Sequence, residues 1–298
     1  MSNHTGIILD GTHITLAEIF HSPKGRSLVG IGSFQSAINF NDAETFLGKG
    51  TSQREKTFVT EIAALCKKIK LKPTKISFGI STNVMMSQTI PVDITLPEIQ
   101  TERQTQWELQ QYFVDAEIEN IATGLLPPIT EGQQPTSIMV AVQNPVITFL
   151  TNVAKKLKST LHIIDAIPFC AEASLMYNYP QITKRRAMLI GIKEHNFDVN
   201  VVYDGKSVHT ASFEWTTKNP AEHIANVTEQ LQGEIIYLYG KNISPQFVDI
   251  IKQNVVCTVE VFDTVRKIAI TPSVKEIEEL KQHKYEYSSA IGLALRTE

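Results

Sequence analysis

The sequence has 298 residues, of which 42% are hydrophobic and 20% are charged. This composition excludes a disordered or fibrous chain, and the length predicts about two globular domains. With 28 basic and 31 acidic side chains the net charge is −3. Such a chain has no broad positive field, so a nucleic-acid-binding protein is disfavoured.

The residue pattern also argues against several kinds of site and segment. Cys66, Cys170 and Cys257 are widely spaced among apolar residues, which indicates reduced core residues in the cytosol and not a disulfide framework or a zinc site. The histidines show no H-x-x-x-H spacing, so no metal site is predicted. The start of the chain lacks the pattern of a signal peptide, and the most apolar stretch, 138–150, is too short to span a membrane.

Strands and helices are expected in alternation along the first half of the chain. Asp10-Gly11 suits a tight hairpin turn, and Ser52-x-x-Glu55 and Thr95-x-x-Glu98 are each typical of a capping box at a helix start. We expect strands at 6–9, 14–19, 27–34, 75–80, 84–92, 138–142 and 161–166, helices starting near Ser52, Thr95 and Asn144 and over 168–177, and a loop at 124–137.

The second half repeats this order. Its expected elements are strands at 187–192, 197–203, 208–213, 234–239 and 256–262, a hairpin turn at Asp204-Gly205, and helices starting at Asn219-Pro220 and Ser244-Pro245 and covering 276–280 and 288–295. The doubling predicts two related α/β domains that face each other across a cleft. We assign 1–83 and 156–180 to the first domain, 84–155 to an inserted α+β subdomain, and 181–298 to the second domain.

Several stretches resemble one family within the actin, Hsp70 and sugar-kinase superfamily. They are ILDGTHITLAEI at 8–19, WELQQYF at 107–113, DAIPFCAEA at 165–173, VNVVYDG at 199–205 and IGLALR at 291–296. Together they are similar to PilM, the cytoplasmic actin-like protein of type IV pilus assembly. The resemblance implies two duplicated actin-like (ribonuclease H-like) domains. Since few residues separate Phe213 from Pro220, this chain resembles a trimmed member.

The resemblance also implies that one hairpin turn in each domain presents backbone N–H groups to nucleotide phosphates, beside an Asp that organises Mg²⁺. In the first turn Gly11 and Thr12 match the family, but the Asp position holds Leu9. Asp10 lies one residue later, and such a shift sends a side chain to the opposite face of a strand. Asp10 is therefore either a displaced magnesium organiser or, as we favour, only a residue of the hairpin turn.

The other two nucleotide loops depart further from the family. In the second turn the Asp falls on Gly191 and the Gly on Lys193, and we expect Lys193 to be a solvated lysine at the strand end. In the adenosine loop Gly240 is kept, but Lys241 replaces a second glycine. We predict no effective ATP hydrolysis and no required cofactor. Any ATP and Mg²⁺ that bind would meet Asp10, Gly11, Thr12, Lys193, Gly240 and Lys241.

The partner that the resemblance implies is the short cytoplasmic tail of a PilN-like inner-membrane protein, bound in a groove between the core domain and the insertion. We place this groove within 84–92 and 95–113, with Val84, Ile90, Val92 and Trp107 as contacts. Trp107 itself is expected mainly as a packing anchor of the insertion. The chain would then be a cytoplasmic scaffold, peripheral at the inner membrane.

Other interpretations stay open. The first is a nucleotide-switched actin-like ATPase that still binds ATP and Mg²⁺. A secretion-system relative of the GspL kind is another, and self-association is a third open point. A divergent sugar or acetate kinase would need a catalytic carboxylate and a polar sugar site, and the sequence shows neither.

Overall fold

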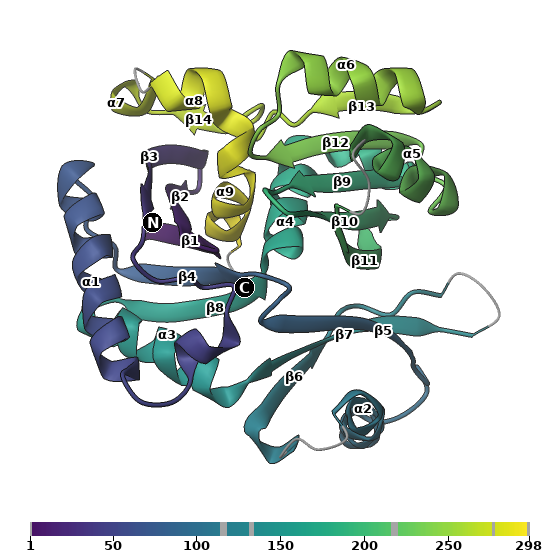
Figure 1. Ribbon diagram of the computed structural model, residues 1–298, viewed down its shortest axis with the longest axis horizontal. Helices are drawn as coiled ribbons and strands as arrows, with labels where there is room; N and C mark the ends of the chain where they lie inside the picture. The colour runs from purple at the N-terminus through teal and green to yellow at the C-terminus, as the bar shows by residue number, and fades with distance from the viewer. Residues whose placement is uncertain (1, 114–117, 131–133, 216–219, 276–277, 297–298) are drawn as a thin grey trace.

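The computed structural model describes residues 2–113, 118–130, 134–215, 220–275 and 278–296. Two lobes, each built on its own sheet, lie side by side in Figure 1, the first at the left and the second at the upper right, and a smaller three-stranded sheet projects from the first lobe. The expected helix end near Val114 and the expected helix starts at Asn219 and Glu276 lie outside the described residues.

The first lobe is built on a six-stranded sheet of order β14-β3-β2-β1-β4-β8. Its strands are β1 (Ser2–Asp10), β2 (His13–Ser22), β3 (Gly25–Gln35), β4 (Lys75–Ile80), β8 (Thr160–Ala166) and β14 (Ala269–Ile270). Side chains alternate between the faces of the sheet. Ile7 and Leu9 therefore enter the core beneath α1 (Thr51–Lys68) and α3 (Asn144–Lys156), whereas Ile8 faces the opposite core. A short η1 (Ala43–Phe46) adds Phe46 to the first of these cores.

The second lobe repeats this arrangement in a five-stranded sheet of order β11-β10-β9-β12-β13. Its strands are β9 (Ala187–Ile192), β10 (Asn196–Tyr203), β11 (Lys206–Glu214), β12 (Ile235–Gly240) and β13 (Thr258–Val261). As in β3-β2-β1-β4-β8, three antiparallel strands are followed by two parallel ones. Helices α5 (Pro220–Gln230) and α6 (Pro245–Asn254) cover one face of this sheet. The duplicated α/β architecture is confirmed.

The insertion between β4 and α3 is a small sheet covered by one helix. Strands β5 (Met85–Pro91), β7 (Thr136–Gln143) and β6 (Ile121–Leu125) form the sheet in the order β5-β7-β6. Helix α2 (Glu98–Tyr112) places Leu109 against Ile90 and Met139 of this sheet, and η2 (Ile118–Asn120) precedes β6. Helix α3, inside the expected 84–155 insertion, packs against α1 and β8 of the first lobe. The proposed domain limits stay a prediction.

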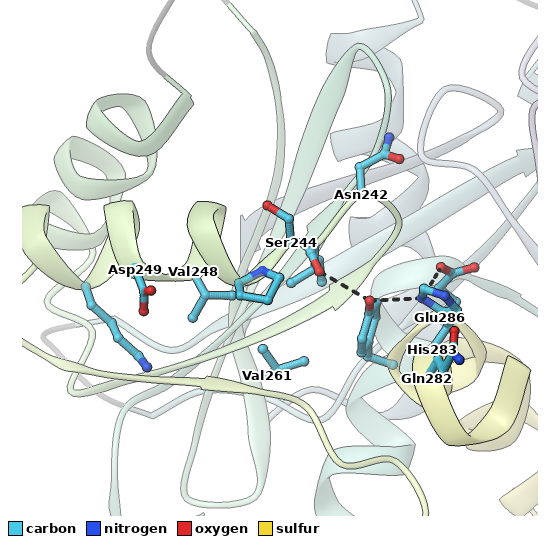
Figure 2. Close-up of a pocket in the computed structure, with 12 residues that line it drawn as sticks. Asn242, Ser244, Val248, Asp249, Val261, Gln282, His283 and Glu286 are labelled. Atoms are coloured by element: carbon cyan, nitrogen blue, oxygen red, sulfur yellow. Dashed lines mark hydrogen bonds and ion pairs between the residues drawn. The ribbon is translucent and has the colours of Figure 1, made fainter. Parts of the chain in front are cut away.

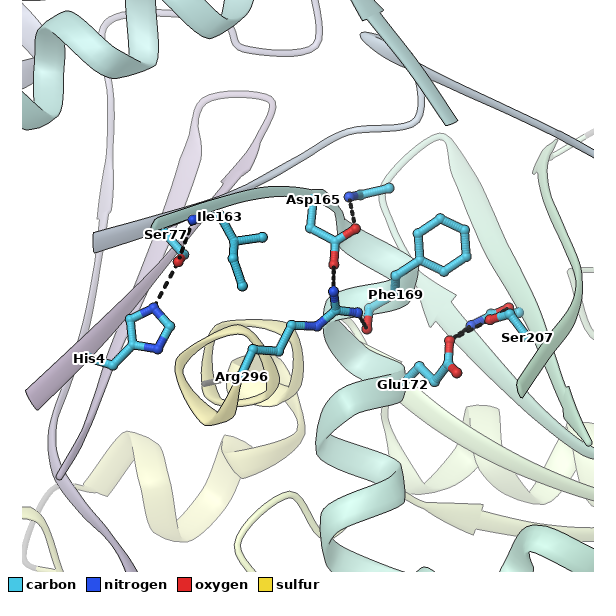
Figure 3. Close-up of polar contacts among 10 residues, drawn as sticks. His4, Ser77, Ile163, Asp165, Phe169, Glu172, Ser207 and Arg296 are labelled. Carbon is cyan, nitrogen blue, oxygen red and sulfur yellow. Dashed lines mark hydrogen bonds and ion pairs between the residues drawn. The ribbon is translucent and has the colours of Figure 1, made fainter. Parts of the chain in front are cut away.

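The C-terminal segment lies between the lobes. Helices α4 (Ile167–Asn178) and α9 (Ser288–Leu295) run side by side between the two sheets in Figure 1. Every residue of α9 is buried, and each large apolar side chain there contributes about 1.5–3 kcal/mol. Arg296 follows α9, pairs with Asp165 of β8 (Nη1–Oδ2, 2.6 Å) and donates to the carbonyl of Phe169 in α4 (Figure 3). The remaining short helices are η3 (Pro180–Lys184), α7 (Pro272–Lys275), α8 (Glu278–His283) and η4 (Lys284–Tyr287).

Several local predictions were wrong. The capping box at Ser52 does not form, because α1 begins after Gly50 and Glu55 is instead buried against Asn152 and Lys156 of α3. Thr95 bonds to Asp93, and α2 begins after Pro97 without a side-chain cap. Strand β6, within and before the loop expected at 124–137, was missed. The Asp204-Gly205 turn and the helix start at Ser244-Pro245 are confirmed.

Candidate functional site

A cavity of about 1040 Å³ lies where the β1–β2 hairpin of the first lobe faces the β9–β10 hairpin of the second. A smaller cavity of about 40 Å³ adjoins it and shares Asp10, His13, Lys193 and Lys241 with it. The structure thus brings together all the residues that the sequence assigns to nucleotide binding. Asp10, Gly11, Thr12, Lys193 and Lys241 line the larger cavity, and Gly240 lines the smaller one.

The first hairpin differs by one residue from the sequence prediction. Asp10 pairs with His13 across the strands, so the turn residues are Gly11 and Thr12, not Asp10 and Gly11. Leu9 is fully buried in the core beneath α1, whereas Asp10 lies one position on and lines the cleft. The strand alternation that removes Leu9 from the cleft therefore places the Asp10 carboxylate in it.

The backbone of this turn already has partners within the protein. The Gly11 N–H donates to Oδ1 of Asn41 at 2.9 Å, and the Thr12 hydroxyl donates to Oε1 of Gln35 at 2.9 Å. The Gly11 and Thr12 carbonyl groups accept from the Phe40 and Ser36 amides. Of the backbone N–H groups that the resemblance assigns to phosphate, that of Gly11 therefore already has an acceptor within the protein. This contact could not be predicted from the sequence, because Asn41 lies thirty residues from Gly11.

Lys193 is not the solvated residue that the sequence predicted. Its side chain is only 9% exposed, and its Nζ lies 2.5 Å from Oδ2 of Asp198, which is fully buried. Burial lowers the pKa of Lys193, but the Asp198 and Asp10 carboxylates outweigh this effect and raise it above the usual value. The lysine is therefore a protonated group inside the cleft. Neighbouring Glu194 and His195, by contrast, extend into solvent.

The third loop, which contains Gly240 and Lys241, packs against the second hairpin. Gly240 has φ of 100°, and a Cβ there would lie 2.3 Å from the Ile192 carbonyl oxygen, so only glycine fits. The Lys241 N–H donates to that same oxygen at 3.0 Å. Burial lowers the pKa of Lys241, an effect that the Asp10 charge partly opposes. The pKa of His13, on the other side of the cleft, falls to about 4 through burial and the nearby Lys241 charge.

The residues expected to contact a partner have unequal access to solvent. Ile90 and Val92 are buried in the core of the insertion, and Val84 is half-buried against the first lobe. Trp107 is 58% exposed on α2, so the expectation of a packing anchor was wrong. Three further large apolar side chains of this segment are exposed, namely Ile94, Ile99 and Tyr112. We call these four residues the α2 apolar set.

A second groove, of about 880 Å³, lies between α6 of the second lobe and the segment from α8 to η4 (Figure 2). Val248 and Val261 line one side of it, and Gln282 and Glu286 line the other. The hydroxyl of Tyr285 donates to the Ile243 carbonyl at 3.2 Å and lies 3.1 Å from Nδ1 of His283, which fixes this side of the groove.

Comparison with solved structures identifies the architecture. A chain described as the PilM-PilN type IV pilus biogenesis complex is similar, with a TM-score of 0.77, 15% identity and 98% coverage of each chain. An inorganic polyphosphate/ATP-glucomannokinase from Arthrobacter sp. strain KM has a TM-score of 0.50 and 12% identity over 99% of this chain and 98% of that one. The fold is actin-like. No family model and no curated protein matches the sequence.

The residues in this actin-like cleft do not fit the magnesium–nucleotide site that the sequence resemblance implies. The Gly11 amide bonds to Asn41, the Asp198 carboxylate is paired with Lys193, and the position aligned with the family's Asp is Gly191. The Tyr239 ring covers Gly191, because a Cβ there would lie 2.6 Å from the ring. Among the described residues, no group of three or more His, Cys, Asp or Glu side chains is placed to hold a metal ion.

Within the described part of the chain, no helix combines the length and the apolar character that a membrane span requires.

Proposed function

We propose that this protein is a PilM-like scaffold that binds the cytoplasmic tail of a PilN-like inner-membrane protein, and that it is held at the membrane through that partner. The α2 apolar set supports this proposal. Exposed apolar residues that are scattered singly need no explanation, but Trp is among the residues most enriched at the energetic centres of interfaces. Ile99 and Trp107 are about 12 Å apart along α2, a distance that a short peptide can span.

The charge of α2 favours a basic tail. The helix carries Glu98, Glu102 and Glu108 against Arg103 alone, so 1 − 3 gives a net charge of −2. Opposite charge on a partner speeds encounter and sets register more than it adds affinity. The expected ligand is therefore a short peptide that carries both apolar and basic residues, and Trp107 would be its main apolar contact.

The experiment is a titration of the intact chain with fluorescent peptides that match the cytoplasmic tails of one-span membrane proteins encoded beside its gene. We expect one of these peptides to bind and Trp107→Ala to weaken it at least about tenfold, as loss of an interface hot spot does. The matched control is Ile250→Ala, because Ile250 is 44% exposed in the other lobe. It leaves the affinity unchanged.

Two results would contradict the proposal. The first is that no tail peptide binds. The second is that Trp107→Ala and Ile250→Ala bind the peptide equally well. We propose further that binding needs no ATP or Mg²⁺, so that adding both leaves the peptide affinity unchanged. A peptide affinity that depends on ATP and Mg²⁺ would instead favour the nucleotide-switched alternative.

A further inference from the structure

The ion pair between Lys193 and Asp198 links the residue after β9 to β10 of the second hairpin. Alternate residues of a strand share a face, so Lys193 and Gly191 point the same way, and Gly191 is paired with Asp198 on the neighbouring strand. The Lys193 side chain places Nζ 2.5 Å from Oδ2 of Asp198, while the Tyr239 ring occupies the space over Gly191.

This ion pair lies at the boundary between the lobes. The other carboxylate oxygen of Asp198 accepts from the Thr82 hydroxyl at 3.4 Å, and Thr82 follows β4 of the first lobe. Asp198 is fully buried and Lys193 nearly so. Burying two charges costs solvation free energy that their attraction seldom exceeds. A buried pair of this kind is therefore weak evidence for stability and calls for another explanation.

A second carboxylate, from the first lobe, acts on the same ammonium group. Asp10 lines both cavities of the cleft together with Lys193, and its charge, like that of Asp198, favours the protonated lysine. The ammonium thus pairs directly with the carboxylate of the second hairpin and shares its cleft with the carboxylate of the first. Two carboxylates and water molecules are the ligands by which proteins commonly hold Mg²⁺.

We propose that the Lys193 ammonium is a built-in cation that takes the place of a divalent metal ion between Asp10 and Asp198. An ammonium group has three N–H donors and needs no metal-like coordination geometry. It neutralises the facing carboxylates while the lobes stay together, and its positive charge repels a divalent cation. The cleft therefore recruits no Mg²⁺, and the contact between the lobes does not depend on nucleotide. This inference concerns the cleft alone and is independent of tail binding at α2.

The test is a titration of the full-length chain with Mn²⁺, followed by electron paramagnetic resonance of the free ion and by thermal unfolding. The wild type is expected to bind no Mn²⁺ in the cleft. Lys193→Ala removes the ammonium and leaves both carboxylates, so its Mn²⁺ affinity rises by at least about tenfold, the effect that single groups near a metal site commonly have. Its unfolding temperature then rises with added MnCl₂. The double variant Lys193→Ala/Asp198→Asn, which lacks one carboxylate, is the matched control and loses both effects.

Three results would overturn the proposal. One is that the wild type binds Mn²⁺ with an affinity that Asp198→Asn abolishes. Another is that Lys193→Ala gains no more Mn²⁺ affinity than the double variant. The third is a calorimetric titration in which the wild type binds ATP only with Mg²⁺ and loses this binding on Asp10→Ala.

If Lys193→Ala does not fold in metal-free buffer, refolding with MnCl₂ becomes the measurement. Better recovery with Mn²⁺ supports the proposal, and equal failure with and without it contradicts it.

Discussion

The buried imidazole of His4 makes the first lobe sensitive to acid. His4 is 1% exposed, and its Nε2 lies 2.7 Å from the Ser77 hydroxyl (Figure 3). Its ring lies 5.2 Å from that of His162 and 6.1 Å from that of His21. The pKa of His4 falls to about 3, chiefly through burial; the charges of Lys75, His162 and His21 also lower it, and a backbone hydrogen bond with Arg296 raises it.

The sign of the pH dependence follows from this lowered pKa. An unfolded histidine takes up a proton near pH 6.5, whereas folded His4 stays neutral down to about pH 3. The stability that neutral His4 supplies is complete above about pH 6.5 and is lost as the pH falls toward 3. Between about pH 7 and about pH 5 this residue alone costs about 2 kcal/mol.

We expect His4→Gln to reduce this loss when the free energy of unfolding in urea is compared at the two pH values. His195→Gln, at an 89% exposed side chain, is the control and leaves the loss as it is in the wild type. An equal loss in His4→Gln and in the wild type would show that folding does not lower the pKa of His4.

At the residue scale, the sequence predicted which residues lie near one another in the cleft, but not which side chains are paired, buried or exposed. Asp10, Lys193 and Lys241 could be predicted as neighbours, because the resemblance aligned their loops. The pairing of Lys193 with Asp198 was missed, although the register that places Asp198 opposite Gly191, two residues before Lys193, brings both side chains to one face of the sheet. The exposure of Trp107 could not be read, because helical spacing alone does not say which face is covered.

Helix α9 shows how closely single elements pack here. A Cβ at Gly292 would lie 1.8 Å from the Cys170 carbonyl oxygen and 2.7 Å from the Ser174 amide of α4. In an unconstrained helix, Gly→Ala stabilises by about 1 kcal/mol. At Gly292 we expect the opposite sign, a loss of about 3 kcal/mol through overpacking against the α4 backbone.

Urea unfolding of Gly292→Ala measures this effect. Gly124→Ala in β6 is the control, because the nearest atom to a Cβ there is the Val140 Cγ2 at 3.4 Å, an ordinary contact distance. It should change stability by less than about 0.5 kcal/mol. A Gly292→Ala chain more stable than the wild type would mean that α4 and α9 are less tightly packed than the structure has them.

Element prediction failed where tertiary contacts override local signals. Ser52-x-x-Glu55 has the residues of a capping box, yet Glu55 is held by Asn152 and Lys156 of α3, which lie a hundred residues away. Strand β6 is half-exposed and contains Gly124, so its own sequence shows little strand preference. It becomes a strand because β7 offers a free edge.

At the scale of the whole molecule, the duplication could be predicted because each half contains its own apolar strands in the same order. The place of the C-terminal segment could not, because an apolar stretch of eight residues does not indicate which sheet it covers. In the structure β14 extends the first sheet and α9 packs on β1, β2 and α4, although both follow the second lobe in sequence. The chain therefore crosses between lobes more than once.

This crossing predicts that both lobes unfold together. Ile291 of α9 is fully buried in the core between α4 and the first sheet, so Ile291→Ala should cost about 3 kcal/mol. In a Trp107→Phe background the remaining tryptophan, Trp215, is stacked on Phe197 with ring centroids 4.6 Å apart and reports on the second lobe. Far-UV circular dichroism reports on the whole chain.

We expect Ile291→Ala to lower both urea midpoints equally, because both lobes lose the packing of α9 at once and then unfold in one transition. The exposed control Ile250→Ala should move neither midpoint. Trp215 fluorescence that keeps its wild-type midpoint, while circular dichroism splits into two transitions, would show that the second lobe folds without α9.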